Sequence, residues 1–175
     1  MLLPHAASAP RINYQLTMLD NKQSSISMFD NCNYYETIGT QEMSVEKALV
    51  ETFYFEVWNK KSFVKAQEIL SEDFTFRGSL GDLKKGIDGF WSYVESVHNA
   101  LSQYECIIEE LVVSENQIAA KMIFKGIHKN RFFDVEPTGQ LIQWSGAAFF
   151  KFSDKKISEL WVLGDVDAIK AQLKN

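Results

Sequence analysis

The second half of the chain is built from segments in which apolar and polar residues alternate, with short turn sequences between them. Successive side chains of a β-strand point to opposite faces, so this alternation is typical of strands that bury one face. We expect strands at about 105–113, 117–128, 140–152 and 156–164. The turns between them are Ser114-Glu115-Asn116, Pro137-Thr138-Gly139 and the hairpin Ser153–Lys155. Consecutive strands joined in this way predict an antiparallel sheet.

The residues before these strands have helical patterns instead. A helix is expected at about 45–59, where apolar residues recur at the spacing of one helical face. Ser62 can cap a second, short helix through Leu70, and a third helix at about 84–101 carries a wide apolar stripe. A short strand is expected at 73–77. Three N-terminal helices followed by antiparallel strands predict an α+β domain, and a curved sheet covered on one face would leave a cone with a mouth for a ligand.

The 175 residues fit one domain, but residues 1–43 differ in composition from the rest. They are rich in Ser, Asn, Gln and Thr and show no sustained periodicity. Such segments bury too little apolar surface to offset the entropy of ordering. We therefore expect a polar, poorly ordered extension at 1–43 and a single domain at 44–175, with Ser44 as the cap of the first helix.

The charge of the chain argues against several classes of partner. The net charge is -5 and the pI is about 5.2, which does not suit a nucleic-acid-binding protein, because phosphate neutralisation supplies most of that affinity. No apolar run reaches the roughly 20 residues that span a bilayer, and the N-terminus lacks the features of a signal peptide. We expect a cytoplasmic protein that binds neither nucleic acid nor membrane.

Cysteine and histidine spacing predicts no metal site. Cys32 and Cys106 form no CxxC motif, and His5, His98 and His128 are scattered along the chain. No disulfide is expected in a reducing compartment. His98 falls on the apolar stripe of the third helix and is interpreted as a core histidine.

Two ionisable residues at strand ends are the candidates for acid/base chemistry. Asp165 follows the apolar residues Trp161 and Leu163, and strict alternation places all three on one face of the last strand. Burial of a carboxylate raises its proton affinity, which suits a general base. His128 ends an earlier strand on the same face as Phe124 and could donate a hydrogen bond to a substrate oxygen. Asp165 could instead cap a terminal helix in water, and His128 could instead bond a loop.

Aromatic residues make up 13% of the chain, and several are candidates for a pocket wall. Trp144, Trp161 and Phe124 lie on strands, and Tyr54 and Trp91 lie on helical faces. Indole and phenol rings offer an apolar surface together with one polar group each, although core packing is the stronger explanation for the tryptophans and for Tyr54.

The motifs in the second half of the chain resemble those of the SnoaL-like polyketide cyclases, which belong to the superfamily of nuclear transport factor 2 and ketosteroid isomerase. They run Gly126-x-His128, Pro137-Thr138-Gly139, Trp144-Ser145-Gly146, Lys156-Ile157 and Trp161-Val162-Leu163-x-Asp165. The resemblance covers about residues 45–173. It implies a curved antiparallel sheet wrapped around a long helix, usually a homodimer, and cyclases that need no cofactor. The family's catalytic aspartate matches Asp165 and its pocket histidine matches His128.

Residues and resemblance together predict a protein that binds a small apolar carbonyl compound and transfers a proton next to the carbonyl, as in an aldol-type cyclisation or an isomerisation. Asp165 would be the acid/base and His128 would assist at the oxygen. The alternative is a ligand-binding or dimerisation module without catalysis, which is favoured if the two side chains do not converge. Epoxide hydrolysis is less well supported, because Arg77 is the only central arginine.

Overall fold

The computed structural model describes residues 45–79 and 81–174. The extension predicted at 1–43, the proposed Ser44 cap and Cys32 lie outside the described residues. The helices are residues 45–52 continuing into η1 (Phe53–Trp58), then α2 (Phe63–Ile69), α3 (Gly86–Ala100) and α4 (Val166–Leu173). The strands are β1 (Leu70–Arg77), β2 (Leu83–Lys85), β3 (Leu101–Ser114), β4 (Gln117–His128), β5 (Leu141–Ser153) and β6 (Lys156–Gly164).

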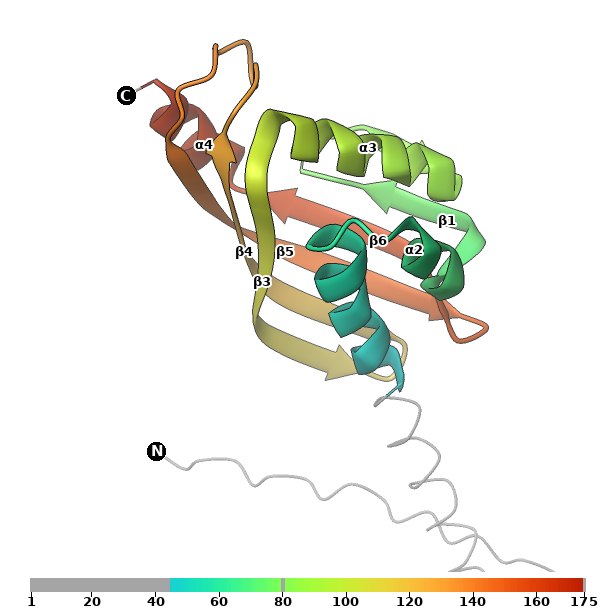
Figure 1. The fold of residues 1–175 in the computed structure, drawn as a ribbon. Coiled ribbons are helices and arrows are strands. Elements are labelled where there is room, and N and C mark those ends of the chain that lie inside the picture. Colours follow the sequence, from blue (N-terminus) through green and yellow to red (C-terminus); the bar gives the residue numbers. More distant parts are fainter. Residues whose placement is uncertain (1–44, 80, 175) are drawn as a thin grey trace, which may run out of the picture.

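The six strands form one curved sheet in the order β2-β1-β6-β5-β4-β3. The first helix, α2 and α3 cover one of its faces, which confirms the predicted α+β class (Figure 1). The sheet is mixed, however, because β1 runs parallel to β6. The expectation of a purely antiparallel sheet is wrong for this pair. Most of the domain separates β1 from β6 in sequence, so no short turn forces these two strands into opposite directions.

Strand β6 contains an irregularity that strict alternation misses. Its pairing with β5 shifts register just after Ile157, and the next fully buried residue is Leu160. Trp161 and Leu163 therefore point to the outer face of the sheet, where 38% and 52% of their surfaces are exposed. The expectation that the face carrying Trp161, Leu163 and Asp165 is buried is therefore wrong, because one extra residue reverses the alternation of the rest of a strand.

Phenylalanine rings join the helices to the inner face of the sheet. Phe90 of α3 stacks on Phe53 of η1 at 5.4 Å between ring centroids and meets Phe76 of β1 edge-on at 5.0 Å. Phe53 in turn meets Phe150 of β5 at 5.6 Å. Each of these side chains is buried, and burial of such a side chain stabilises the fold by about 1.5–3 kcal/mol.

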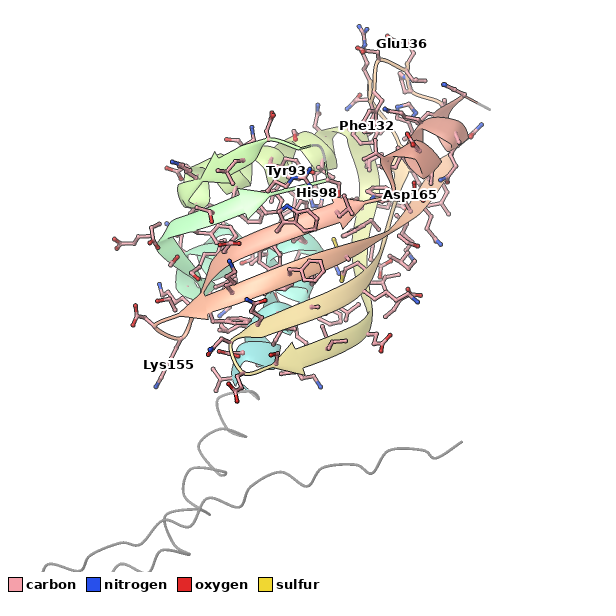
Figure 2. The ribbon with its side chains drawn as sticks, turned by 180° about the vertical axis from the view of Figure 1, so that it is seen from behind. Tyr93, His98, Phe132, Glu136, Lys155 and Asp165 are labelled. Atoms are coloured by element: carbon pink, nitrogen blue, oxygen red, sulfur yellow. The ribbon has the colours of Figure 1, made fainter. Side chains whose placement is uncertain are left out.

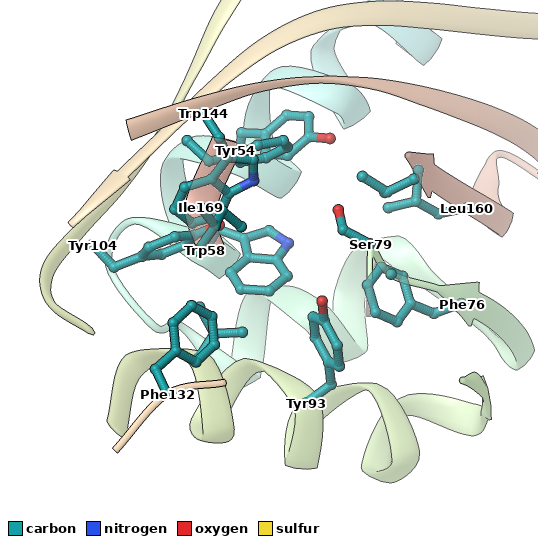
Figure 3. A pocket seen from close by; sticks show the side chains of 14 residues that line it. Tyr54, Trp58, Phe76, Ser79, Tyr93, Tyr104, Phe132, Trp144, Leu160 and Ile169 are labelled. Atoms are coloured by element: carbon teal, nitrogen blue, oxygen red, sulfur yellow. The ribbon is translucent and has the colours of Figure 1, made fainter. Parts of the chain in front are cut away.

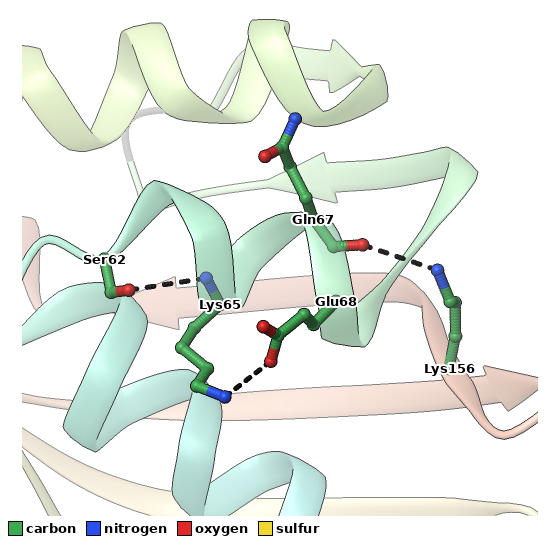
Figure 4. A network of polar contacts seen from close by, with 5 residues as sticks. All are labelled: Ser62, Lys65, Gln67, Glu68 and Lys156. Atoms are coloured by element: carbon green, nitrogen blue, oxygen red, sulfur yellow. Dashed lines mark hydrogen bonds and ion pairs between the residues drawn. The ribbon is translucent and has the colours of Figure 1, made fainter.

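Helix α2 is capped and tied to the sheet by polar contacts (Figure 4). The Ser62 hydroxyl accepts a hydrogen bond from the Lys65 amide at 3.3 Å, which confirms the predicted cap. Lys65 also pairs with Glu68 one turn later. The Lys156 ammonium donates to the Gln67 carbonyl at 3.4 Å and so links the end of α2 to the start of β6.

Candidate functional site

An aromatic pocket lies between the first helix, α3 and the inner face of the sheet (Figure 3). Three of its residues, Ser79, Tyr93 and Phe132, are half-buried and form its rim. The buried lining residues are Tyr54, Trp58, Phe76, Gly78, Val97, Tyr104, Phe124, Trp144, Leu160, Val162 and Ile169. The volume open to the centre of a water molecule is about 30 Å³. None of the described residues in this lining is an Asp, Glu, His, Lys or Arg.

Two pocket residues come from a π-helical turn at the end of the first helix. The Asn59 amide donates to the Tyr54 carbonyl at 2.9 Å, a bond that spans five residues instead of four. The wider turn keeps Tyr54 and Trp58 on one face, and both are buried in the pocket. π-Helical turns are rare and occur frequently at functional sites.

Glycine at position 164 makes room for the polar part of the pocket. A Cβ atom at Gly164 would lie 3.1 Å from Trp144 Nε1 and only 2.5 Å from Ser79 Oγ. Trp144 itself pairs with Phe124 across β4 and β5, at 5.6 Å between ring centroids. The indole N–H and the serine hydroxyl can approach β6 closely only because this residue lacks a side chain.

Hydrogen-bond donors face the open space. Figure 3 shows the hydroxyls of Tyr54, Ser79 and Tyr93 and the indole nitrogens of Trp58 and Trp144 around it. Tyr54 Oη and Trp144 Nε1 are fully buried and find no hydrogen-bond partner among the described residues. Burial raises the pKa of Tyr54 well above that of a free phenol, so this hydroxyl keeps its proton.

Residues behind the pocket fix the end of the π-helical turn. His98 of α3 donates from Nε2 to the Trp58 carbonyl at 2.9 Å, and its ring stacks on the Trp58 indole. The Asn59 side chain exchanges two hydrogen bonds with the backbone of Cys106 on β3, at 2.8 and 3.0 Å. Burial lowers the pKa of His98, and Lys61 adds to this effect. These contacts agree with the interpretation of His98 as a bonded core histidine.

His128 is completely buried at the end of β4, but it does not line the pocket. Its Nδ1 accepts a hydrogen bond from the Thr138 amide at 3.2 Å and lies 3.1 Å from the Thr138 hydroxyl. Because Nδ1 accepts from the amide, the hydrogen of the neutral ring sits on Nε2. Among the described residues Nε2 has no partner. The side chain thus bonds the loop that follows β4, as the alternative interpretation expected.

Asp165 is exposed and caps α4. Its Oδ1 accepts a hydrogen bond from the Ala168 amide at 2.9 Å, and Figure 2 shows it at the start of that helix. The prediction that Asp165 faces the cone is therefore wrong. The register shift in β6 turns Gly164 inward instead, and Asp is a preferred residue at the N-cap. The carboxylate does not face a ligand in the pocket.

Two of the predicted aromatic residues also lie elsewhere. Trp161 packs on Phe149 on the outer face of the sheet, and the Arg77 guanidinium lies 5.1 Å above its ring. Trp91 packs against Phe63 of α2 at 5.0 Å, on the side of α3 away from the pocket lining. Tyr54, Phe124 and Trp144 do line the pocket.

Several pocket residues were not identified from the sequence. Trp58 lies four residues after Tyr54, and this spacing alone could have placed it on the same helical face. Tyr93 lies beside the apolar stripe of α3, and Ser79 and Phe132 lie in loops, where periodicity carries no signal.

Two further properties concern the described residues as a whole. Across 45–79 and 81–174 every helix falls short of the length and apolar character needed to cross a bilayer. Within the same ranges, no group of three or more His, Cys, Asp and Glu side chains could hold a metal ion.

Comparisons with known proteins agree with the fold. No curated protein matches the sequence. Similar structures include a Jannaschia sp. CCS1 protein assigned as a SnoaL-like polyketide cyclase (TM-score 0.69, 16% identity, covering 74% of this chain and 92% of that one). A SnoaL-like polyketide cyclase from Agrobacterium tumefaciens C58 has a TM-score of 0.59 at 21% identity and covers 71% and 94%. A ketosteroid isomerase-like protein from Catenulispora acidiphila, solved with trimethylamine, has a TM-score of 0.62 at 10% identity and covers 72% and 92%.

The identities to these structures are low, so they establish the fold and not the chemistry. The sequence profile described as "SnoaL-like polyketide cyclase" matches residues 48–173, close to the range over which the sequence motifs resemble that family. The chain belongs to the SnoaL-like polyketide cyclase family.

Proposed function

We propose that this domain binds a small, neutral, largely apolar molecule through a carbonyl oxygen and contributes no carboxylate base to it. The observation that carries the proposal is the pair of buried donors without partners, Tyr54 Oη and Trp144 Nε1, in one aromatic pocket. A buried donor left unpaired costs about 1–3 kcal/mol. A ligand with an acceptor oxygen recovers this cost, whereas a hydrocarbon of the same shape does not.

The charge of the pocket supports a neutral ligand. An indole N–H can only donate, and the Tyr54 hydroxyl keeps its proton because burial raises its pKa. The described lining includes no cationic side chain that would neutralise a carboxylate or phosphate. A ketone or aldehyde offers an acceptor oxygen without a charge, and the aromatic walls suit an apolar body.

The size of the pocket implies that its rim moves when a ligand enters. A volume of about 30 Å³ open to water centres has room for about two water molecules. The half-buried rim residues Ser79, Tyr93 and Phe132 are the side chains that can move most easily when a ligand enters.

Proton abstraction by this chain is the less supported function. A general base must come within about 2.6–3.2 Å of the proton that it removes. Asp165 instead caps α4, and His128 bonds Thr138 outside the pocket lining. The similarity to proteins described as polyketide cyclases supports a second candidate, in which Tyr54 and Trp144 polarise a carbonyl, a water molecule in the pocket takes the α proton, and water returns a proton to the oxygen to give the enol.

The proposal is tested with acetophenone and α-methylstyrene, which have the same shape but differ in the carbonyl oxygen. Two-dimensional NMR of the ¹⁵N-labelled chain resolves the indole N–H groups, and the Trp144 resonance is assigned by its loss in Trp144→Phe. We expect acetophenone to shift this resonance downfield and saturably, and α-methylstyrene to bind more weakly without the downfield shift.

Tyr54→Phe is the matched variant, because it removes only one oxygen atom. It should weaken acetophenone binding by about two- to tenfold, the effect of one net hydrogen bond, and leave α-methylstyrene binding unchanged. Equal binding of the two compounds by the unmodified chain, or no saturable shift with either, would contradict the proposal.

A further inference from the structure

The loop between β4 and β5, residues 129–140, supplies one rim residue of the pocket. Phe132 lines the pocket and is half-buried. Its backbone exchanges two hydrogen bonds with Val135, at 3.0 and 3.1 Å, so Phe133 and Asp134 form a tight hairpin tip with φ of 48° and 61°. This short hairpin makes the position of the Phe132 ring depend on how the whole loop is held.

Each limb of the loop has its own anchor. On the outgoing limb, the amides of Lys129 and Asn130 both donate to the Ala100 carbonyl at the end of α3, at 2.9 and 3.1 Å. On the returning limb, the Thr138 amide donates to His128 Nδ1 at 3.2 Å, and the Thr138 hydroxyl lies 3.1 Å from the same atom. The returning limb is also held by two backbone bonds at His128, from the Gly139 amide to the His128 carbonyl at 3.0 Å and from the His128 amide to the Gln140 carbonyl at 2.8 Å, and the His128 side chain adds the contact to Thr138.

Burial of His128 at this position lowers the stability of the fold. Its ring is fully buried, and Nε2 carries a hydrogen without a partner among the described residues. An unpaired buried donor lowers stability, so the bond to Thr138 is the contribution that distinguishes histidine from an apolar residue here. The ring also lies next to Phe132, at 6.5 Å between centroids.

We propose that His128 is a positioning residue that holds the 129–140 loop so that Phe132 lies at the rim and limits access to the pocket. The inference rests on the proposed function, because limiting access to the pocket has a role only if the pocket binds a ligand. It assigns His128 no contact with the ligand and no proton transfer. Phe132 then controls entry, and His128 acts through it.

Solvent exchange of the Trp144 indole hydrogen in the full chain, without ligand, tests the proposal. This N–H is buried in the pocket, so its exchange reports the fraction of time that the pocket is open. We expect His128→Leu, which removes Nδ1 and with it both contacts to Thr138, to accelerate exchange by about two- to tenfold, the factor for one net hydrogen bond. Thr138→Val removes only the hydroxyl and keeps the amide bond to Nδ1, so it should accelerate exchange less than His128→Leu. His128→Asn should stay within about twofold of the unmodified chain, because its amide oxygen can accept in place of Nδ1.

A double-variant comparison separates positioning from general stability. Phe132→Ala should accelerate exchange by itself. Adding His128→Leu or Thr138→Val should then change the exchange rate no further, because the Phe132 ring that limits access to the pocket is already absent. Phe133→Ala is the control, since it alters the same hairpin tip without a pocket residue. Equal acceleration by His128→Leu with and without Phe132, or faster exchange of Ala148 and the other core β5 amides as well, would overturn the proposal.

The outcome does not depend on His128→Leu folding. Thr138 is exposed, so Thr138→Val removes the hydroxyl contact to Nδ1 from the loop side while the amide bond remains. No change in exchange with this variant would also overturn the inference. Because these measurements use no ligand, failure of acetophenone to bind would contradict the proposed function without deciding the role of His128.

Discussion

Removal of the Asp165 carboxylate should destabilise the domain, although a buried catalytic carboxylate would have the opposite effect. In the structure Asp165 accepts from the Ala168 amide at the N-terminus of α4 and is exposed. Asp165→Ala should cost about 1 kcal/mol, within the usual range of about 0.5–2 kcal/mol for the loss of an N-cap. Asp165→Asn keeps the cap and should lose only the attraction of the charge to the helix terminus, about 0.3–1 kcal/mol.

Urea denaturation followed by circular dichroism measures these differences. For a domain of this size 1 kcal/mol corresponds to about 2–4 °C in Tm, which thermal unfolding can confirm. Asp167→Ala is the matched control, because Asp167 is exposed in the first turn of the same helix but does not cap it. The cost of Asp165→Asn should shrink at high salt, whereas the cap contribution of Asp165→Ala should remain.

Ligand binding provides the second test of the position of Asp165. Because its side chain does not line the pocket, acetophenone affinity should stay within about twofold in both variants, as expected for a residue without ligand contact. If either variant is as stable as the unmodified chain or more stable, the reasoning fails. A tenfold loss of acetophenone affinity in Asp165→Asn would indicate that the carboxylate takes part in ligand binding.

Three further outcomes follow from the geometry. Gly164→Ala should crowd the Trp144 indole N–H, destabilise the fold by about 1–3 kcal/mol and weaken acetophenone binding, as measured by NMR titration. The chain should be a dimer in light scattering at micromolar concentration, and Phe149→Glu on the exposed outer face should make it monomeric. Burial lowers the pKa of His98, so just below pH 6.5 the folded state binds fewer protons than the unfolded state, and the free energy of unfolding should fall as the pH drops through this range. His98→Gln should remove this part of the pH dependence, measured by urea titration at several pH values, while its amide still donates to the Trp58 carbonyl.

Much of the fold was predictable because local patterns and tertiary packing agree. Alternation located β4 at Gln117–His128 and β6 at Lys156–Gly164, with the bounds that the structure has. The N-cap at Ser62 was also predictable, because a hydroxyl before an apolar helical pattern has a single favourable local role. The parallel pairing of β1 with β6 was not, because it depends on contacts between segments that are distant in sequence.

The site was harder to predict than the fold. Tyr54, Phe124 and Trp144 were identified as aromatics on inward faces, and their faces follow from regular periodicity. Ser79 and Phe132 reach the pocket from loops, whose paths depend on bonds such as the one between His128 and Thr138. Local pattern contains no information on these bonds.

The register of β6 decides which chemistry the pocket offers. Regular alternation from Ile157 would turn position 165 inward with its carboxylate, but the shift after Ile157 turns Gly164 inward and leaves Asp165 to cap α4. A motif that matches a catalytic aspartate in sequence therefore does not imply a catalytic aspartate in space. The inward glycine leaves room for the Trp144 N–H at the pocket. The same register shift therefore keeps the Asp165 carboxylate out of the pocket and allows a buried donor into it. Among the described residues the pocket lining offers donors and no base, and this is the reason for proposing that it holds an oxygen acceptor and does not abstract a proton.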